Sequence, residues 1–225
     1  MSESLTTLTR TAFAVLLGAL LVAAPLPASA QKKLYTRSYL LQDFRSQTTR
    51  IVLDGPEDLC RALWEDATAV WTLSPYEFCT LADYEADACK EGCYFLRPTE
   101  SRGIVYLTLT RGASKPMTVV SIPVAGTSYR DPLLYMPAYL SIIQDYVEAA
   151  MSSEFKAYLG LRSATRGTAW GKKVFKDPSE AAKAFHSGDP DAAVQVIITP
   201  DGNFSSRPRH KLVIGASQYE LYRYR

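Results

Sequence analysis

Residues 104–110 read IVYLTLT and residues 118–124 read TVVSIPV. Apolar residues alternate along both stretches, with the two-residue period of a β-strand that buries one face. The segment between them contains Gly112, Ser114 and Pro116, so we predict an antiparallel hairpin over about 104–124. Pro123 has no backbone N–H to donate, and the second strand should therefore end there or run along a sheet edge.

Strands and helices alternate on the N-terminal side of this hairpin. Asp54-Gly55 predicts a turn, and Pro56 followed by two acids suits the first turn of a helix that continues through Trp64. Thr80 and Asp83 have the spacing of a capping box, with Asp in place of the usual Glu, which predicts a short helix to about Ala88. The expected strands on this side are 35–41, 50–53, 68–73 and 94–96.

The same alternation continues on the C-terminal side. Apolar residues recur every three or four positions from about Asp131 or Pro137 to Ser152, which predicts the longest helix. A second helix is expected from Pro178 to about Phe185. The expected strands are 172–175, 193–199, 211–216 and 219–225. The order of elements predicts a single α/β domain over 31–225, with a mixed β-sheet flanked by helices.

The N-terminus has the pattern of an export signal. Residues 12–24 are an uninterrupted apolar run, which Pro25 and Pro27 end, and Ala28-Ser29-Ala30 matches a small-residue cleavage site. Thirteen apolar residues are too few for a permanent membrane anchor. We therefore expect residues 1–30 to be a cleavable signal peptide, and a secreted or periplasmic mature chain without a membrane span.

Charge is unevenly distributed along the chain although its net value is only +2. Residues 54–91 contain ten acids against two bases, and residues 92–225 contain 17 bases against 11 acids. An anionic partner at the basic end, near 207–211 or the terminal YRYR, is one interpretation. Solvated charges on opposite faces are the other, and the mixed composition favours them. No nucleic-acid partner is predicted.

All four cysteines lie in the exported part, where disulfides can form. Cys89 and Cys93 flank K-E-G, and a local bridge between them is the favoured pairing. Cys60 and Cys79 suit either buried thiols or a second bridge. The spacing lacks the paired C-x-x-C of a zinc site, so no metal and no cofactor are predicted.

The sequence contains no complete catalytic motif, and no catalytic residue is assigned. Residues 167–173 miss the spacing and the hydroxyl of a phosphate-binding loop, and no G-x-S-x-G accompanies a histidine. His186 is expected to cap a helix C-terminus beside Gly188. His210 is expected to be an exposed loop residue. A pair of catalytic carboxylates stays open, since separation in space is not visible in a sequence.

Aromatic residues supply the candidate ligand site, which comprises Trp71, Tyr76, Glu77 and Phe78. Tyr76 and Phe78 fall on one side of an extended chain, whereas Trp64 follows a predicted core stripe. Glu77, the only charge in S-P-Y-E-F, is interpreted either as a ligand-facing acid or as a solvated loop acid, and the second is favoured.

The stretch WTLSPYEFCTLADYEADACKEGCYFL at 71–96 resembles a segment of uncharacterised exported proteins from Bacteroides-type bacteria. The shared pattern is W-x-x-S-P-Y-E-F, an acidic helix and a Y-F-L strand, and this chain departs from it at Cys89 and Cys93. The resemblance implies a bacterial envelope protein and carries no activity.

Together these features favour a non-enzymatic module that binds an envelope ligand or protein partner. Two alternatives stay open. One is a carboxylate-dependent hydrolase of glycans or peptides, and the other is a structural envelope component that associates through the 219–225 edge strand.

Overall fold

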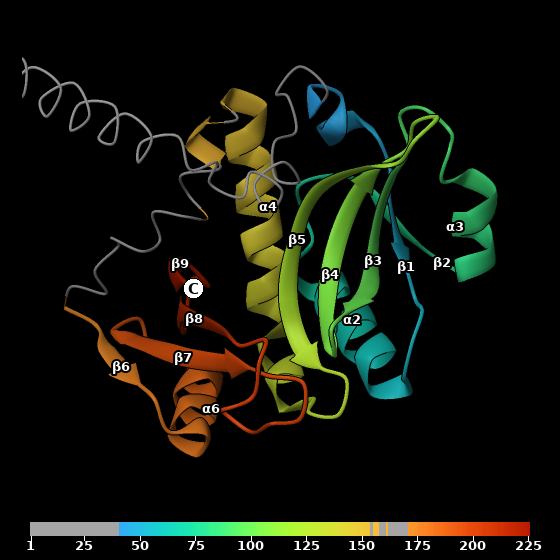
Figure 1. Cartoon of the computed structure of the whole chain (residues 1–225). Coiled ribbons are helices and arrows are strands. Elements are labelled where there is room, and N and C mark those ends of the chain that lie inside the picture. The colour runs from blue at the N-terminus through green and yellow to red at the C-terminus, as the bar shows by residue number, and fades with distance from the viewer. Residues whose placement is uncertain (1–40, 154, 158–160, 162–170) are drawn as a thin grey trace, which may run out of the picture. The chain divides into compact units, whose positions relative to one another are not determined.

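A computed structural model describes residues 41–153, 155–157, 161 and 171–225 (Figure 1). These residues fall within one compact unit and contain two mixed β-sheets with helices packed against them. The predicted α/β class is confirmed, although the strands form two sheets where one was expected. The expected signal peptide, 1–30, and the expected strand at 35–41, apart from Leu41, lie outside the described residues.

Among the described residues, sheet A has five strands in the order β2-β1-β3-β4-β5. β1 pairs in parallel with β2 and β3, whereas β3-β4-β5 is an antiparallel meander. The predicted hairpin is therefore confirmed, and Pro123 lies on the edge strand β5, where the sequence allows a proline. The bounds are β1 Thr49–Val52, β2 Tyr76–Cys79, β3 Tyr94–Ser101, β4 Ile104–Arg111 and β5 Met117–Gly126.

One face of sheet A forms the main core. A row of paired residues crosses all five strands, and helices α2 and α4 pack over this face (Figure 1). Residues directly opposite each other on paired strands share a face of the sheet, so the residues of this row all face the core. This is why apolar residues recur at every second position along the strands. The row runs Phe78, Ile51, Leu96, Leu109 and Val120.

The two helices over this face, α2 and α4, lie in different connections of the chain. α2 (Glu57–Val70) connects the parallel strands β1 and β2. α4 (Met136–Ser152) follows the 3₁₀ turn η3 (Asp131–Tyr135) and carries Pro137 in its first turn, where a missing N–H is tolerated. A further 3₁₀ turn, η2, spans Phe44–Ser46.

The opposite face of sheet A carries α3 (Leu81–Asp87). The Tyr84 ring meets the buried Phe95 ring edge-on, with centroids 5.1 Å apart, and the Arg97 guanidinium lies 4.5 Å from the Tyr84 centroid. The predicted capping box is confirmed, because Thr80 Oγ1 accepts from the Asp83 N–H and the Asp83 carboxylate accepts from the Thr80 N–H.

In the part of the chain that the structure describes, sheet B has four strands in the order β6-β7-β8-β9. α6 (Pro178–Ser187) connects the parallel strands β6 and β7, and β7-β8-β9 is antiparallel. Gly188 adopts φ 61° at the end of α6, with His186 in the last turn, so the predicted C-terminal cap is confirmed. The bounds are β6 Lys173–Phe175, β7 Ala192–Ile198, β8 His210–Gly215 and β9 Leu221–Tyr224.

The strand expected at 68–73 is absent, because α2 continues through Val70. Gln144 of α4 holds the chain where that helix ends. Its Oε1 accepts from the N–H groups of Thr72 and Leu73 at 2.8 and 2.9 Å, and its Nε2 donates to the Val70 carbonyl at 3.0 Å. This long-range contact fixes the turn that leads into β2.

Candidate binding site

Trp71, the first of the sequence-predicted ligand residues, lies in the core. Its side chain is 4% exposed, and its Nε1 donates to Ser74 Oγ at 3.2 Å. Ser74 Oγ also lies 2.8 Å from Thr49 Oγ1. The indole therefore anchors the turn before β2, and its polar group is already paired.

Tyr76 and Phe78 lie on the same side of edge strand β2, as the sequence predicts. Their rings meet edge-on with centroids 5.7 Å apart, and the Phe78 centroid lies 6.3 Å from that of Trp64 on α2. Trp64 is 51% exposed, so its expected place in the core was wrong. The structure thus brings two of the predicted residues together with a third aromatic ring, Trp64, which the sequence pattern predicts in the core.

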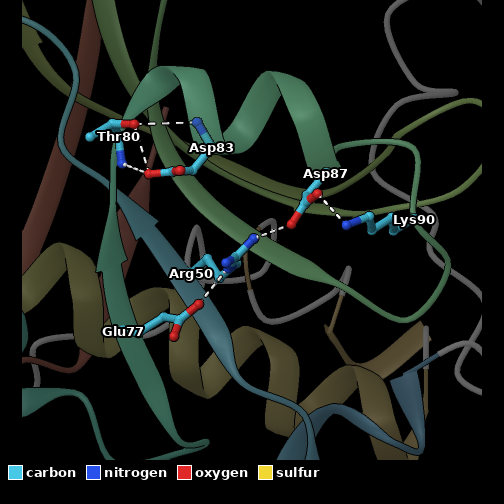
Figure 2. A network of polar contacts seen from close by, with 6 residues as sticks. All are labelled: Arg50, Glu77, Thr80, Asp83, Asp87 and Lys90. Atoms are coloured by element: carbon cyan, nitrogen blue, oxygen red, sulfur yellow. Dashed lines mark hydrogen bonds and ion pairs between the residues drawn. The ribbon is translucent and has the colours of Figure 1, made fainter.

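Glu77 points to the other side of β2 and takes part in an ion-pair network (Figure 2). Arg50 of β1 contacts both Glu77 and Asp87, and Lys90 contacts Asp87 at 2.5 Å. Hydrogen bonds from Lys90 and then Arg50 lower the pKa of Asp87. Because α3 carries Asp87, the network ties α3 to the edge of sheet A, which is a structural role for Glu77.

All four cysteines are free thiols, and the predicted Cys89–Cys93 bridge is not formed. Cys89 is exposed in the turn after α3, whereas Cys93 is partly buried and its carbonyl accepts from the Gly112 N–H at 2.7 Å. The backbone of Cys93 is thus fixed against the end of β4, on the far side of the K-E-G turn.

A cavity of about 540 Å³ lies between sheet B and the segment that follows β5. One wall comes from β7 (Gln195–Ile197) and from the first turns of α6, and the other comes from Tyr129 and η3. Phe204, 39% exposed, closes it from the β7–β8 loop. The charged groups on its wall are Lys176 and Asp131. The cavity combines aromatic and apolar walls with a few polar groups, as ligand sites do.

The free edge of β7 explains this cavity. The ladder between β6 and β7 runs from Lys173–Ala192 only to Phe175–Val194, whereas β7 continues to Ile198. No described strand pairs with the last four residues of β7 on the side of β6. The space that a longer β6 would fill is left open to the cavity.

A second cavity of about 600 Å³ is polar and carries several carboxylates. Burial, followed by the nearby charge of Glu65, raises the pKa of Asp66 to about 6. Asp58 in the same wall pairs with Arg130 at 3.1 Å. His186 also lines this cavity.

His210 is partly buried, contrary to the expectation of an exposed loop residue. Its Nε2 lies 3.0 Å from the Tyr106 hydroxyl of β4, and its Nδ1 lies 3.4 Å from the Tyr224 hydroxyl of β9. Burial lowers its pKa. The histidine joins the two sheets through aromatic side chains, and this pairing over 104 positions leaves no local signal in the sequence.

Comparisons with protein-family models, curated proteins and solved structures gave no significant match. Within the described ranges, no cluster of three or more His, Cys, Asp or Glu side chains could hold a metal ion. No helix in the same ranges is long and apolar enough to cross a bilayer.

Proposed function

We propose that the mature chain is an exported, non-enzymatic module that binds an envelope ligand in the 540 Å³ cavity between α6, β7 and η3. The observation that carries this proposal is the composition of the wall. Tyr129, Tyr135 and Phe204 offer aromatic surface, while Lys176 and Asp131 offer one charge of each sign. Such a wall suits a ligand with an apolar or aromatic body and a charged group at its end, such as a short peptide.

Export and an envelope location rest on the N-terminal sequence. The apolar run, its proline break and the A-S-A site support cleavage after Ala30. The resemblance of residues 71–96 to exported Bacteroides-type proteins supports the same location. Mass spectrometry of the protein secreted from a bacterial host tests this part, and a mature N-terminus other than Gln31 contradicts it.

The cavity is tested with a thermal-shift screen of residues 31–225 against peptides and glycans. A ligand that prefers the native state raises the melting temperature. Ala182 lines the cavity from α6, so Ala182→Trp fills it, whereas Ala69→Trp adds the same ring on an exposed part of α2. The shift should be lost in the first variant and kept in the second. A screen without any shift, or a shift that survives Ala182→Trp, contradicts the proposal.

The hydrolase alternative is favoured by one observation, the raised pKa of Asp66 in the second cavity. A carboxyl group that holds its proton near pH 6 can act as a general acid. Incubation with pooled glycans and peptides separates the two functions. Turnover that Asp66→Asn abolishes would establish the hydrolase, whereas the binding module predicts none.

The structural alternative depends on self-association through the C-terminal strand. The structure places β9 at the edge of sheet B, as that alternative requires. The strand carries Arg223, followed by Arg225, and charged residues on an edge oppose pairing with a second copy. The charge of this edge therefore favours the binding module.

A further inference from the structure

Basic side chains gather on the outer face of sheet B. Leu212 and Ile214 of β8 point into the core, so Lys211 and Val213 point away from it. Arg223 is paired with Val213, and the backbones of Arg225 and Lys211 exchange hydrogen bonds of 2.8 and 2.9 Å. Residues paired in this way share a face. Lys211, Arg223 and Arg225 thus form one row on the side of the sheet opposite the core.

Two further cations extend this row into the neighbouring loops. Burial, and then the charges of Arg223, Lys176, Arg209 and Arg225, lower the pKa of Lys211. Each of these four side chains is therefore close enough to Lys211 to repel it, and together with Lys211 they make a set of five cations. None of them takes part in an ion pair among the described residues. We call them the basic face. Like charges placed together destabilise a fold unless an anionic partner offsets them.

Edge protection accounts for only part of this cluster. Arg223 and Arg225 belong to the edge strand and its end, where charges oppose aggregation. Lys211 lies on an interior strand, and Arg209 lies in the loop before it, so neither guards an edge. A partner that contacts the whole face accounts for all five.

Aromatic residues next to the basic face indicate the kind of partner. The Tyr222 ring lies 3.3 Å from where a Cβ would stand at Gly215, and Gly215 shares the face of Lys211 and Val213 on β8. The loop that carries Arg209 also exposes Phe204, whose carbonyl accepts from Arg209 Nη1 at 2.8 Å. A dissolved polyanion gains little from an exposed phenyl ring. A bilayer interface accommodates both cations and aromatic rings.

We propose that the basic face docks the protein onto an anionic lipid surface. The contact is peripheral: lysine and arginine side chains contact lipid phosphates, and the aromatic rings at the margin reach the headgroup region. Each cation near such a surface contributes about 1 kcal/mol, or about fivefold in affinity. The surface adjoins the ligand cavity at Lys176 and Phe204, which both line that cavity, and is otherwise separate from it.

The test is co-sedimentation of residues 31–225 with vesicles of phosphatidylcholine in which about one lipid in three is phosphatidylglycerol. This anionic lipid gives the vesicle surface a negative potential. Lys211→Glu/Arg223→Glu should weaken binding at least about 25-fold, since two fivefold contributions are lost. Lys115→Glu/Lys183→Glu makes the same change of net charge at exposed positions elsewhere and should keep binding. High salt should release the wild-type protein.

Circular dichroism confirms that each variant folds, and Lys211→Gln/Arg223→Gln replaces the charge-reversal variant if that one does not. Equal loss in both pairs of variants would overturn the proposal, because net charge alone would then explain binding. Binding to soluble polyglutamate but not to vesicles would also overturn it, and so would a failure to bind either.

Discussion

Replacing Gln144 by alanine removes three hydrogen bonds at the junction between α2, α4 and β2. The Gln144 side chain is 9% exposed and pairs with the Thr72 and Leu73 N–H groups and the Val70 carbonyl. Each hydrogen bond contributes about 1 kcal/mol net, and a buried group left unpaired costs about 1–3 kcal/mol. Water reaches the exposed Thr72 and relieves part of this cost. We expect a loss of about 2–4 kcal/mol in the free energy of unfolding.

Urea unfolding followed by tryptophan fluorescence measures this loss, and Trp71 lies beside the junction. Two further variants separate hydrogen bonding from packing. Gln144→Met fills a similar volume without pairing and should lose nearly as much stability as alanine.

Gln144→Glu keeps an acceptor but needs its proton to donate to the Val70 carbonyl. Burial raises the pKa of such a group, so its stabilising effect is present at low pH and is lost as the pH rises through the folded pKa. Wild-type stability in Gln144→Met, within about 0.5 kcal/mol, would refute the reasoning, because a difference of that size is typical of surface substitutions.

Three further predictions concern buried or titratable side chains: Asp66, Tyr139 and the four cysteines. Asp66→Asn should be more stable than the wild type above pH 6 by about 1 kcal/mol, since the raised pKa of Asp66 means that its ionised form destabilises the fold. The figure is reduced from the roughly 3 kcal/mol of a two-unit shift because the group is half exposed. Urea titrations at about pH 3, below the unfolded pKa of an aspartate, and at about pH 8 should show the difference only at the higher pH. Tyr139→Phe should stabilise the protein by about 1 kcal/mol, because within the described ranges the buried Tyr139 hydroxyl has no hydrogen-bond partner; a lower melting temperature would contradict this. Thiol titration should find four free cysteines, and the exposed Cys89 should react first. Cys60 and Cys79 should react more slowly, because burial raises their pKa values. A count of two thiols in unreduced protein would instead indicate that the Cys89–Cys93 bridge forms.

Local signals in the sequence predict much of the fold. The alternation in β4 and β5, the Thr80–Asp83 capping box and the His186–Gly188 helix end each depend on residues close together in the chain. The strand expected at 68–73 was wrong because apolar residues there continue a helix. That helix ends where a side chain 74 positions away pairs with its last carbonyl, a contact that no window of sequence contains.

The candidate sites show the same limit. Tyr76 and Phe78 are neighbours because a strand alternates, and the sequence predicts their shared side. The ligand cavity instead requires Tyr129, which follows sheet A, and Gln195 of sheet B to line the same space. The basic face depends on the register between β8 and β9, which places Lys211 opposite Arg225. The charge count alone shows an excess of bases in this half of the chain without showing that they share a face.

The strands of the two sheets come from separate parts of the chain. The described strands of sheet A lie between residues 49 and 126, and those of sheet B lie between 173 and 224. During synthesis, the described strands of the first sheet therefore leave the ribosome before the described strands of the second. Domains assemble in that direction as the chain emerges. A chain passed through a translocon in the same order can close its first sheet while the second is still in transit.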